Sequence, residues 1–257
     1  MDLRIRALPA LVAALFFALA WNTGAKGQVV VSAAVSLTNV LQELAPIFQK
    51  RTGDQIVLNL AASNTLAQQI GFGAPVDLFI SADEVQMGKV AAELVAGSRV
   101  DLLGNQLAIA VPDDKARTLA SARDLTDASI KRIAIGDPGA VPAGVYARQY
   151  LQTIGLWSQL ESKMAPTGSV RLALEAVENG AADAAIVYRT DIPTGARARE
   201  AFVVPVADGP RIVYPAAIVR SGKNQAGGRR LLEFLRSPDA TAAFRRAGFL
   251  APAAAQR

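Results

Sequence analysis

The chain alternates short runs of β-branched and aliphatic residues with longer stretches in which apolar positions recur every three or four residues. The short runs are typical of buried strands and the longer stretches of amphipathic helices. The first units pair a strand at 29–31 with a helix over 39–49, a strand at 55–60 with a helix over 65–71, and a strand at 76–80 with a helix from Asp83. Strands separated by helical crossovers pair in parallel, so the pattern predicts an α/β fold.

A second set of units follows a strand at 107–111, which ends at Pro112. It consists of a strand at 132–135, helices from Ala143 and over 170–179, and a strand at 184–188. Gly180 stands where the second helix should end in a left-handed residue. A further strand at 213–219 and two amphipathic helices near 228–236 and 238–247 finish the chain, and we expect them to pack on the first set.

This order predicts two lobes, each a mainly parallel sheet flanked by helices. Lobe 1 comprises residues 26–107 and 213–257, and lobe 2 comprises residues 108–212. Two extended crossings, near 103–111 and 208–215, would join them. Clefts between domains are preferred sites for small molecules, so we expect the ligand between the lobes.

The first 25 residues differ from the rest. Arg4 and Arg6 precede an apolar run over 8–20, which is shorter than the roughly 20 residues needed to span a bilayer. This pattern predicts a signal peptide at 1–25, cleaved after 18–20 or after 23–25, and hence a periplasmic protein. The alternative is a membrane anchor that is not cleaved.

Composition narrows the function further. The chain has no cysteine and no histidine, and its net charge is +5. We therefore expect no disulfides and no histidine base, which makes most hydrolytic chemistry difficult. No basic run is interleaved with aromatic residues, so we expect no nucleic acid partner. The mild positive charge would help to attract a small anion.

Small residues followed by hydroxyl groups stand directly after two of the predicted strands. Ser36 follows the first strand and Ser63 follows the second, each close to a helix start. In lobe 2, Pro142 lacks an N–H, so the backbone N–H of Ala143 is the next free donor at its helix start. Helix N-termini beyond the carboxyl ends of strands favour anions. Each turn alone is also explained by ordinary helix capping.

Together these segments resemble one family, the periplasmic molybdate-binding proteins, over essentially the whole mature chain. No single motif is decisive, but their order and spacing are specific. The matching segments are 33–39, 63–70, 73–83, 103–105, 136–138, 141–144, 186–188 and 214–215. Asn64 departs from the family, which commonly has another serine there.

The resemblance implies a two-lobed periplasmic-binding-protein fold of type II and a site for molybdate, and for tungstate as well. The oxyanion would be held by the hydroxyl and backbone N–H of Ser36 and Ser63, the backbone N–H of Ala143 and Val170, and the phenol of Tyr188. It also implies a monomer that delivers its ligand to an inner-membrane permease with its ATPase, without a cofactor. The same fold could instead hold another tetrahedral oxyanion, in particular sulfate.

Three other hypotheses compete with binding. Ser36 or Ser63 as an enzyme nucleophile lacks both a histidine base and a Gly-x-Ser-x-Gly elbow, so we expect no enzyme. A metal site from Asp77, Asp83 and Glu84 is explained more simply by a capping box at 81–84. The arginine pairs 229–230 and 245–246 could contact a protein partner, but they fit solvated helix faces.

Overall fold

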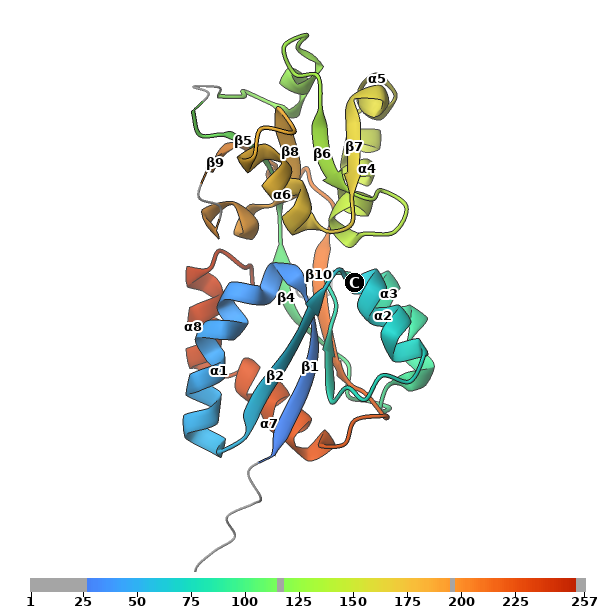
Figure 1. The fold of residues 1–257 in the computed structure, drawn as a ribbon, viewed down its shortest axis with the longest axis vertical. Coiled ribbons are helices and arrows are strands. Elements are labelled where there is room, and N and C mark those ends of the chain that lie inside the picture. Colours follow the sequence, from blue (N-terminus) through green and yellow to red (C-terminus); the bar gives the residue numbers. More distant parts are fainter. Residues whose placement is uncertain (1–26, 115–117, 195–196, 253–257) are drawn as a thin grey trace, which may run out of the picture.

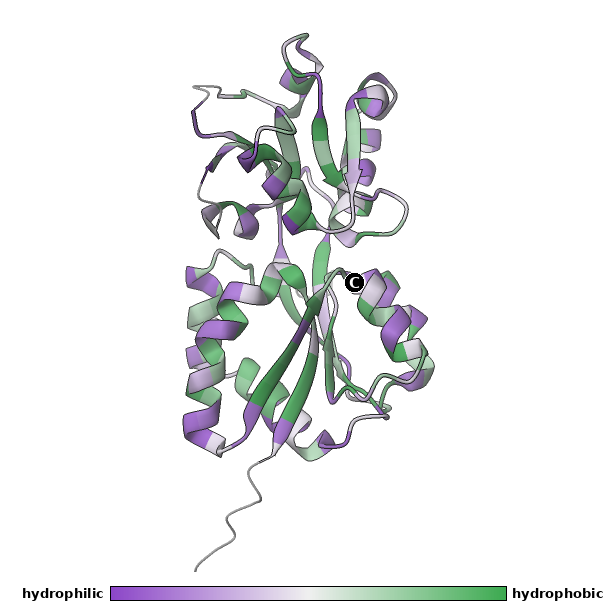
Figure 2. Cartoon of the chain, in the orientation of Figure 1, coloured by the Kyte–Doolittle hydropathy of each residue, from purple (hydrophilic) through white to green (hydrophobic). Residues whose placement is uncertain are grey.

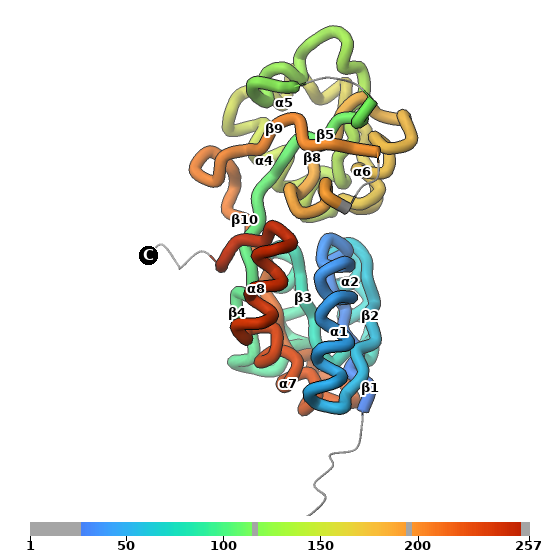
Figure 3. Tube along the Cα trace, turned by 90° about the vertical axis from the view of Figure 1, so that its left-hand side faces the viewer, coloured from blue at the N-terminus to red at the C-terminus, as the bar shows by residue number. Residues whose placement is uncertain are grey.

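Two five-stranded sheets lie one above the other along the long axis of the molecule (Figures 1 and 3). The computed structural model describes residues 27–114, 118–194 and 197–252. The predicted signal peptide at 1–25 lies outside these residues. In the described part of the chain, no helix combines the length and apolar character needed to cross a membrane.

The first sheet has the strand order β2-β1-β3-β10-β4. Its strands are β1 (Gln28–Ala34), β2 (Gln55–Ala61), β3 (Leu78–Ile80), β4 (Val100–Asn105) and β10 (Ile212–Ile218). β1 pairs in parallel with β2 and β3, whereas β10 is antiparallel to β3 and β4. The register between β10 and β4 shifts at Tyr214/Pro215, where proline cannot donate to the ladder.

Helices cover both faces of the first sheet. They are α1 (Thr38–Thr52), α2 (Ser63–Gly71), α3 (Glu84–Lys89), α7 (Gln225–Leu235) and α8 (Pro238–Arg246), with short 3-10 helices η1 (Val35–Leu37) and η2 (Ala91–Glu93). α1, α7 and α8 lie on one face, and α2 and α3 lie on the other (Figure 1). The two C-terminal helices therefore pack on the first sheet, as predicted.

The second sheet has the order β7-β6-β8-β5-β9. Its strands are β5 (Leu107–Pro112), β6 (Ile133–Gly136), β7 (Met164–Thr167), β8 (Ala184–Tyr188) and β9 (Ala198–Val203). The helices around it are α4 (Pro142–Thr153), α5 (Trp157–Leu160), α6 (Val170–Glu178), and the 3-10 helices η3 (Ala122–Thr126), η4 (Glu161–Lys163) and η5 (Arg189–Thr194). α6 packs against β8 and β6, and Gly180 after it has the predicted positive φ of 78°.

The chain passes between the sheets twice, from β4 to β5 and from β9 to β10 (Figure 3). Every residue of β5 and β10 is buried, which matches their continuous apolar sequences. Apolar residues concentrate in the strands and on the inner helix faces, and polar residues on the outer helix faces (Figure 2). Burial of this apolar surface is the main stabilising term for both halves.

The predicted α/β fold class is confirmed, with one refinement. Each sheet is mixed, because two of its strand pairings are parallel and two are antiparallel. The antiparallel pairings all involve β5 or β10, the strands at which the chain enters a different sheet. A strand that arrives from the other half need not follow the right-handed parallel crossover rule.

Candidate functional site

A small cavity, with about 10 Å³ open to a water-sized sphere, lies where helix N-termini of the two halves meet. The residues around it come from both halves of the molecule: Ala34, Val35, Ser36, Ala62, Ser63 and Ala82 from the first, and Val141, Pro142, Ala143, Val170 and Tyr188 from the second. All five residues predicted to bind the ligand therefore line one cavity. Their contact with a ligand stays a prediction.

Ser36 lies in η1, the tight turn between β1 and α1, and is only 4% exposed. Its Oγ lies 2.9 Å from the phenol oxygen of Tyr214. Ala34 and Val35, which directly precede Ser36, also line the cavity. Ser36 thus lines the cavity from the carboxyl end of β1.

Ser63 is the first residue of α2, and its N-cap Ala62 has no polar side chain. The backbone N–H of Ala82 donates to Ser63 Oγ at 2.9 Å. One acceptor position of this hydroxyl is therefore occupied by the protein, and its hydrogen remains available to a ligand. The first backbone N–H groups of α2 have no carbonyl partner within the helix, so they are available as well.

Ala143 is the second residue of α4, directly after Pro142 at the first position, as predicted. The helix start lies very close to the end of β6. A Cβ on Gly144 would lie 1.9 Å from the carbonyl oxygen of Gly136, which only glycine permits. The backbone N–H of Ala143 thereby reaches the cavity wall, and only 1% of the residue is exposed.

Val170 is the first residue of α6. Its N-cap Ser169 accepts from the N–H of Leu172 at 3.3 Å, so the cap serves the third residue of the helix rather than the first. The backbone N–H of Val170 has no intrahelical partner by position. The side chain packs in the core, with 4% exposure.

Tyr188 ends β8 and lines the cavity. The residue is buried, and its hydroxyl has no hydrogen-bond partner in the described structure. Burial raises the pKa of this phenol well above its usual value, so it stays a neutral donor at physiological pH. A buried hydroxyl without a partner is costly and is expected where a ligand supplies the missing acceptor.

No charged side chain lines the cavity within the described residues. An ion pair joins Arg171, which follows Val170, to the buried carboxylate of Asp191 at 2.6 Å. Arg171 also donates to Asn39 Oδ1 at 3.0 Å and so connects α6 with α1. Desolvation outweighs the attraction of Arg171 and raises the pKa of Asp191 to about 6.

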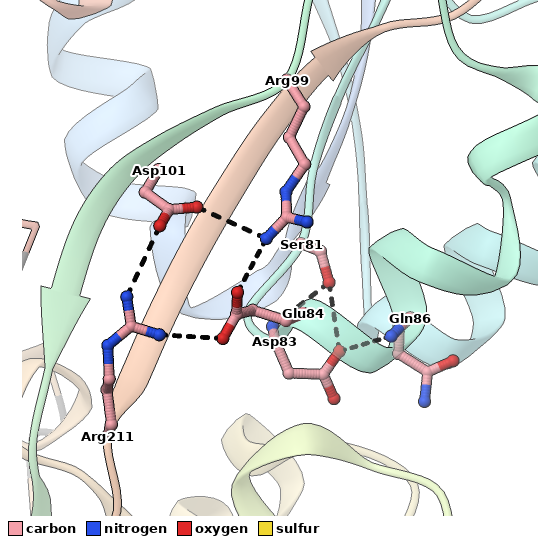
Figure 4. A network of polar contacts seen from close by, with 7 residues as sticks. All are labelled: Ser81, Asp83, Glu84, Gln86, Arg99, Asp101 and Arg211. Atoms are coloured by element: carbon pink, nitrogen blue, oxygen red, sulfur yellow. Dashed lines mark hydrogen bonds and ion pairs between the residues drawn. The ribbon is translucent and has the colours of Figure 1, made fainter. Parts of the chain in front are cut away.

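Acidic residues at the start of α3 form structural contacts beside the site (Figure 4). Asp83 caps the helix by accepting from the N–H of Gln86 at 2.7 Å. The predicted capping box at 81–84 is thus wrong, because the N-cap is Asp83 and not Ser81. Glu84 instead accepts from Arg99 and Arg211, which both also pair with Asp101 (Figure 4).

Asp77, the remaining member of the alternative metal site, accepts from the backbone N–H groups of Val30 and Asn224. Its carboxylate therefore joins β1 to the segment before α7 rather than facing an ion. Within the residues described, no group of three or more acidic or other metal-ligating side chains is arranged to hold a metal. Capping and chain linkage account for these carboxylates.

Residues behind the cavity were not predicted as part of the site. Tyr214 and Asn105 lie behind Ser36, and Asn105 Nδ2 donates to Tyr214 Oη at 3.2 Å. Both belong to segments that carry the family resemblance, but their proximity depends on the register of β4 against β10. Asn64 does not line the cavity, and its buried Oδ1 has no partner in the described structure.

Comparison with known proteins identifies the family. Residues 29–250 match the model of the bacterial extracellular solute-binding proteins. The chain is 39% identical to the molybdate-binding protein ModA of Escherichia coli, over 92% of this chain and 95% of that protein. It is 32% identical to ModA of Haemophilus influenzae, over 88% and 91% of the two chains.

Solved structures agree with this assignment. The periplasmic molybdate-binding protein of Azotobacter vinelandii superposes with a TM-score of 0.79 at 26% identity, covering 87% of this chain and 99% of that one. The sulfate-binding protein SubI of Mycobacterium tuberculosis superposes with a TM-score of 0.75 at 17% identity, covering 87% and 86%, which shows a shared fold. The chain belongs to the bacterial extracellular solute-binding proteins, in the group of the molybdate-binding proteins ModA.

Proposed function

We propose that this protein binds molybdate, and tungstate as well, in the cavity between its two halves. The oxyanion accepts from the hydroxyl and backbone N–H of Ser36 and Ser63, the backbone N–H of Ala143 and Val170, and the phenol of Tyr188. The observation that carries the proposal is the fully buried Tyr188 hydroxyl, which has no partner in a cavity otherwise lined by neutral donors and small residues. Molybdate is the ligand and not a cofactor.

Neutral donors are sufficient for a dianion. A hydrogen bond to a charged group contributes roughly 1.5–3 kcal/mol, and a helix N-terminus adds roughly 0.3–1 kcal/mol. Three α-helices and one 3-10 turn begin at the cavity wall, and several such terms together support micromolar or tighter binding.

A site made of donors favours a fully ionised oxyanion over one that carries an O–H, because the protonated anion needs an acceptor. Ser63 Oγ already accepts from Ala82, so it offers little to such a ligand. Sulfate shares the charge and shape of molybdate and differs in size. The relatives from Escherichia coli and Haemophilus influenzae are named molybdate-binding proteins, and this supports molybdate rather than sulfate as the ligand of this chain.

The protein acts as a carrier and not as an enzyme. After cleavage of the signal peptide at 1–25 it works in the periplasm as a monomer. It delivers the oxyanion to an inner-membrane permease with its ATPase. The relatives and the family of extracellular solute-binding proteins support this role.

Ligand capture closes two lobes on each other. Lobe 1 comprises residues 26–107 and 213–257, and lobe 2 comprises residues 108–212. Gln86 donates to the carbonyl of Ala140 at 3.3 Å, and Arg171 donates to Asn39, so each lobe contacts the other beside the cavity. Small-angle scattering should show a smaller radius of gyration with saturating molybdate, and identical curves would exclude closure.

Isothermal titration calorimetry tests the function. The purified mature chain is titrated with molybdate, tungstate, sulfate and phosphate at neutral pH. Tight one-to-one binding of molybdate and tungstate alone is the expected result. Binding of sulfate with equal affinity, or of none of the four anions, would contradict the proposal.

A further inference from the structure

A buried hydrogen-bond network lies behind the Ser36 hydroxyl. Ser36 Oγ is 2.9 Å from Tyr214 Oη, and Asn105 Nδ2 lies 3.2 Å from the same phenol oxygen. Tyr214 is completely buried, and Ser36 and Asn105 are each 4% exposed. No contact of Tyr214 or Asn105 with the ligand is part of the proposed site, so their polar groups need another explanation.

The orientation of the Asn105 amide is fixed by its neighbours. The backbone N–H of Gln106 donates to Asn105 Oδ1 at 2.9 Å, which assigns the oxygen to that side. Asn105 Nδ2 then directs its hydrogens to Thr190 Oγ1 at 3.0 Å and to Tyr214 Oη. Toward Tyr214, the amide can only donate.

The phenol O–H of Tyr214 then has a single possible hydrogen-bond acceptor among the described residues. Within the described residues, the hydrogen bonds of Tyr214 Oη involve Asn105 Nδ2 and Ser36 Oγ. Because Asn105 donates to this oxygen, the phenol O–H donates to Ser36 Oγ. Ser36 Oγ accepts that bond, and its own hydrogen is left to point into the cavity.

We infer that Tyr214 and Asn105 are positioning residues that commit the Ser36 hydroxyl to donating to the ligand. The inference rests on the proposed function of the cavity. The Ser63 hydroxyl has the same arrangement, because its oxygen accepts a hydrogen bond from the Ala82 N–H and its hydrogen is left for the ligand. Both serine hydroxyls of the cavity thus have a protein donor on their oxygens, and this leaves fewer acceptors for an anion that carries an O–H.

The network also lies where the chain passes between the sheets. Asn105 ends β4, Tyr214 lies on β10 directly after the second crossing, and Thr190 lies in η5 of the other half. A substitution here could therefore affect lobe movement as well as Ser36. The test must separate an effect through Ser36 from a general effect on the hinge.

A double-mutant cycle makes this separation, with molybdate affinity measured by calorimetry. Tyr214→Phe keeps the ring contacts with Tyr188 and Phe249 and removes the hydroxyl. We expect it to lower affinity about tenfold in the wild-type background and less than about twofold in the Ser36→Ala background. In the matched Ser63→Ala background it should again cost about tenfold.

Selectivity gives a second readout. In Tyr214→Phe the Ser36 oxygen becomes free to accept, so the ratio of molybdate to hydrogen phosphate affinity should fall. Asn105→Leu, which removes the donor behind Tyr214, should lower affinity in the same Ser36-dependent manner. This variant replaces Tyr214→Phe in the cycle if thermal unfolding shows that Tyr214→Phe does not fold.

The outcomes are distinct. Equal losses in the wild-type and Ser36→Ala backgrounds, with an unchanged anion ratio, would overturn the role of Tyr214 while leaving the proposed function intact. A wild-type protein that binds none of molybdate, tungstate, sulfate and phosphate would overturn the proposed function, and the positioning role with it.

Discussion

The donors of this cavity are mostly backbone groups and hydroxyls, so the side chain at a site position can be unrelated to its role. Val170 is buried and aliphatic, yet its place as the first residue of α6 makes its N–H a donor. The residue pattern alone indicated candidate donors at Ser36, Ser63 and Ala143. Val170 and Tyr188 came from the resemblance, because a valine or a strand-end tyrosine carries no local signal of binding.

Two substitutions of Val170 distinguish the role of its side chain from the role of its backbone N–H. We expect Val170→Ala to change molybdate affinity by less than about threefold, whereas Val170→Pro removes the N–H and should lower affinity about tenfold. Proline is tolerated at the first helical position, and the extended backbone of Ser169 (φ −161°, ψ 165°) suits a following proline. Calorimetry and circular dichroism on both variants measure binding and folding. Equal affinities of the two variants would exclude the N–H as a donor.

Tyr188→Phe removes a hydroxyl that has no partner without ligand. The free energy of unfolding of the ligand-free protein should stay within about 1 kcal/mol of wild type or rise, while molybdate affinity falls about tenfold. Tyr150→Phe is the control, because Tyr150 is also buried but does not line the cavity. Undiminished affinity in Tyr188→Phe would contradict the assigned donor.

At the level of elements, the sequence predicted the central strands and the main helices but not three edge strands. β4, β7 and β9 each lie at an edge of a sheet. An edge strand pairs on one side only, so its sequence need not be continuously apolar. β7 even contains Pro166, which is compatible with an edge position. Their presence depends on tertiary pairing that local patterns do not encode.

The contact between α4 and β6 depends on one glycine. Gly144→Ala places a Cβ 1.9 Å from the Gly136 carbonyl oxygen, so α4 must shift away from the cavity. We expect a loss of about 1–3 kcal/mol in the free energy of unfolding together with weaker molybdate binding. Gly88→Ala in α3 is the control, because no atom lies within 4 Å of its added Cβ. Chemical denaturation should show that Gly88→Ala is neutral or stabilising, and similar stability of the two variants would refute the close approach.

At the level of the whole molecule, the charge pair between Arg171 and the buried Asp191, both in the second half, links stability to pH. The pKa of Asp191 is raised from 3.8 to about 6, mainly by desolvation. The folded protein therefore binds a proton that the unfolded chain releases in this range. This contribution to stability is fully present below pH 3.8 and is lost as pH rises through about 6.

Asp191→Asn should remove this pH dependence. The difference in unfolding free energy between wild type and Asp191→Asn should change between pH 4 and pH 7, with wild type relatively more stable at the acidic end, by no more than about 3 kcal/mol. Urea denaturation at several pH values measures the difference, and other titrating groups cancel in it. A difference that is independent of pH would show that Asp191 titrates normally.

The central claim is that neutral donors from both halves hold molybdate in one cavity. The most direct measurement is a crystal structure of the mature protein grown with molybdate, with the anomalous signal of molybdenum locating the ligand. We predict one strong peak in the cavity, with oxygens within hydrogen-bond distance of Ser36, Ser63, Ala143, Val170 and Tyr188. A molybdenum peak only at surface arginines, or no ordered molybdenum at all, would contradict this account.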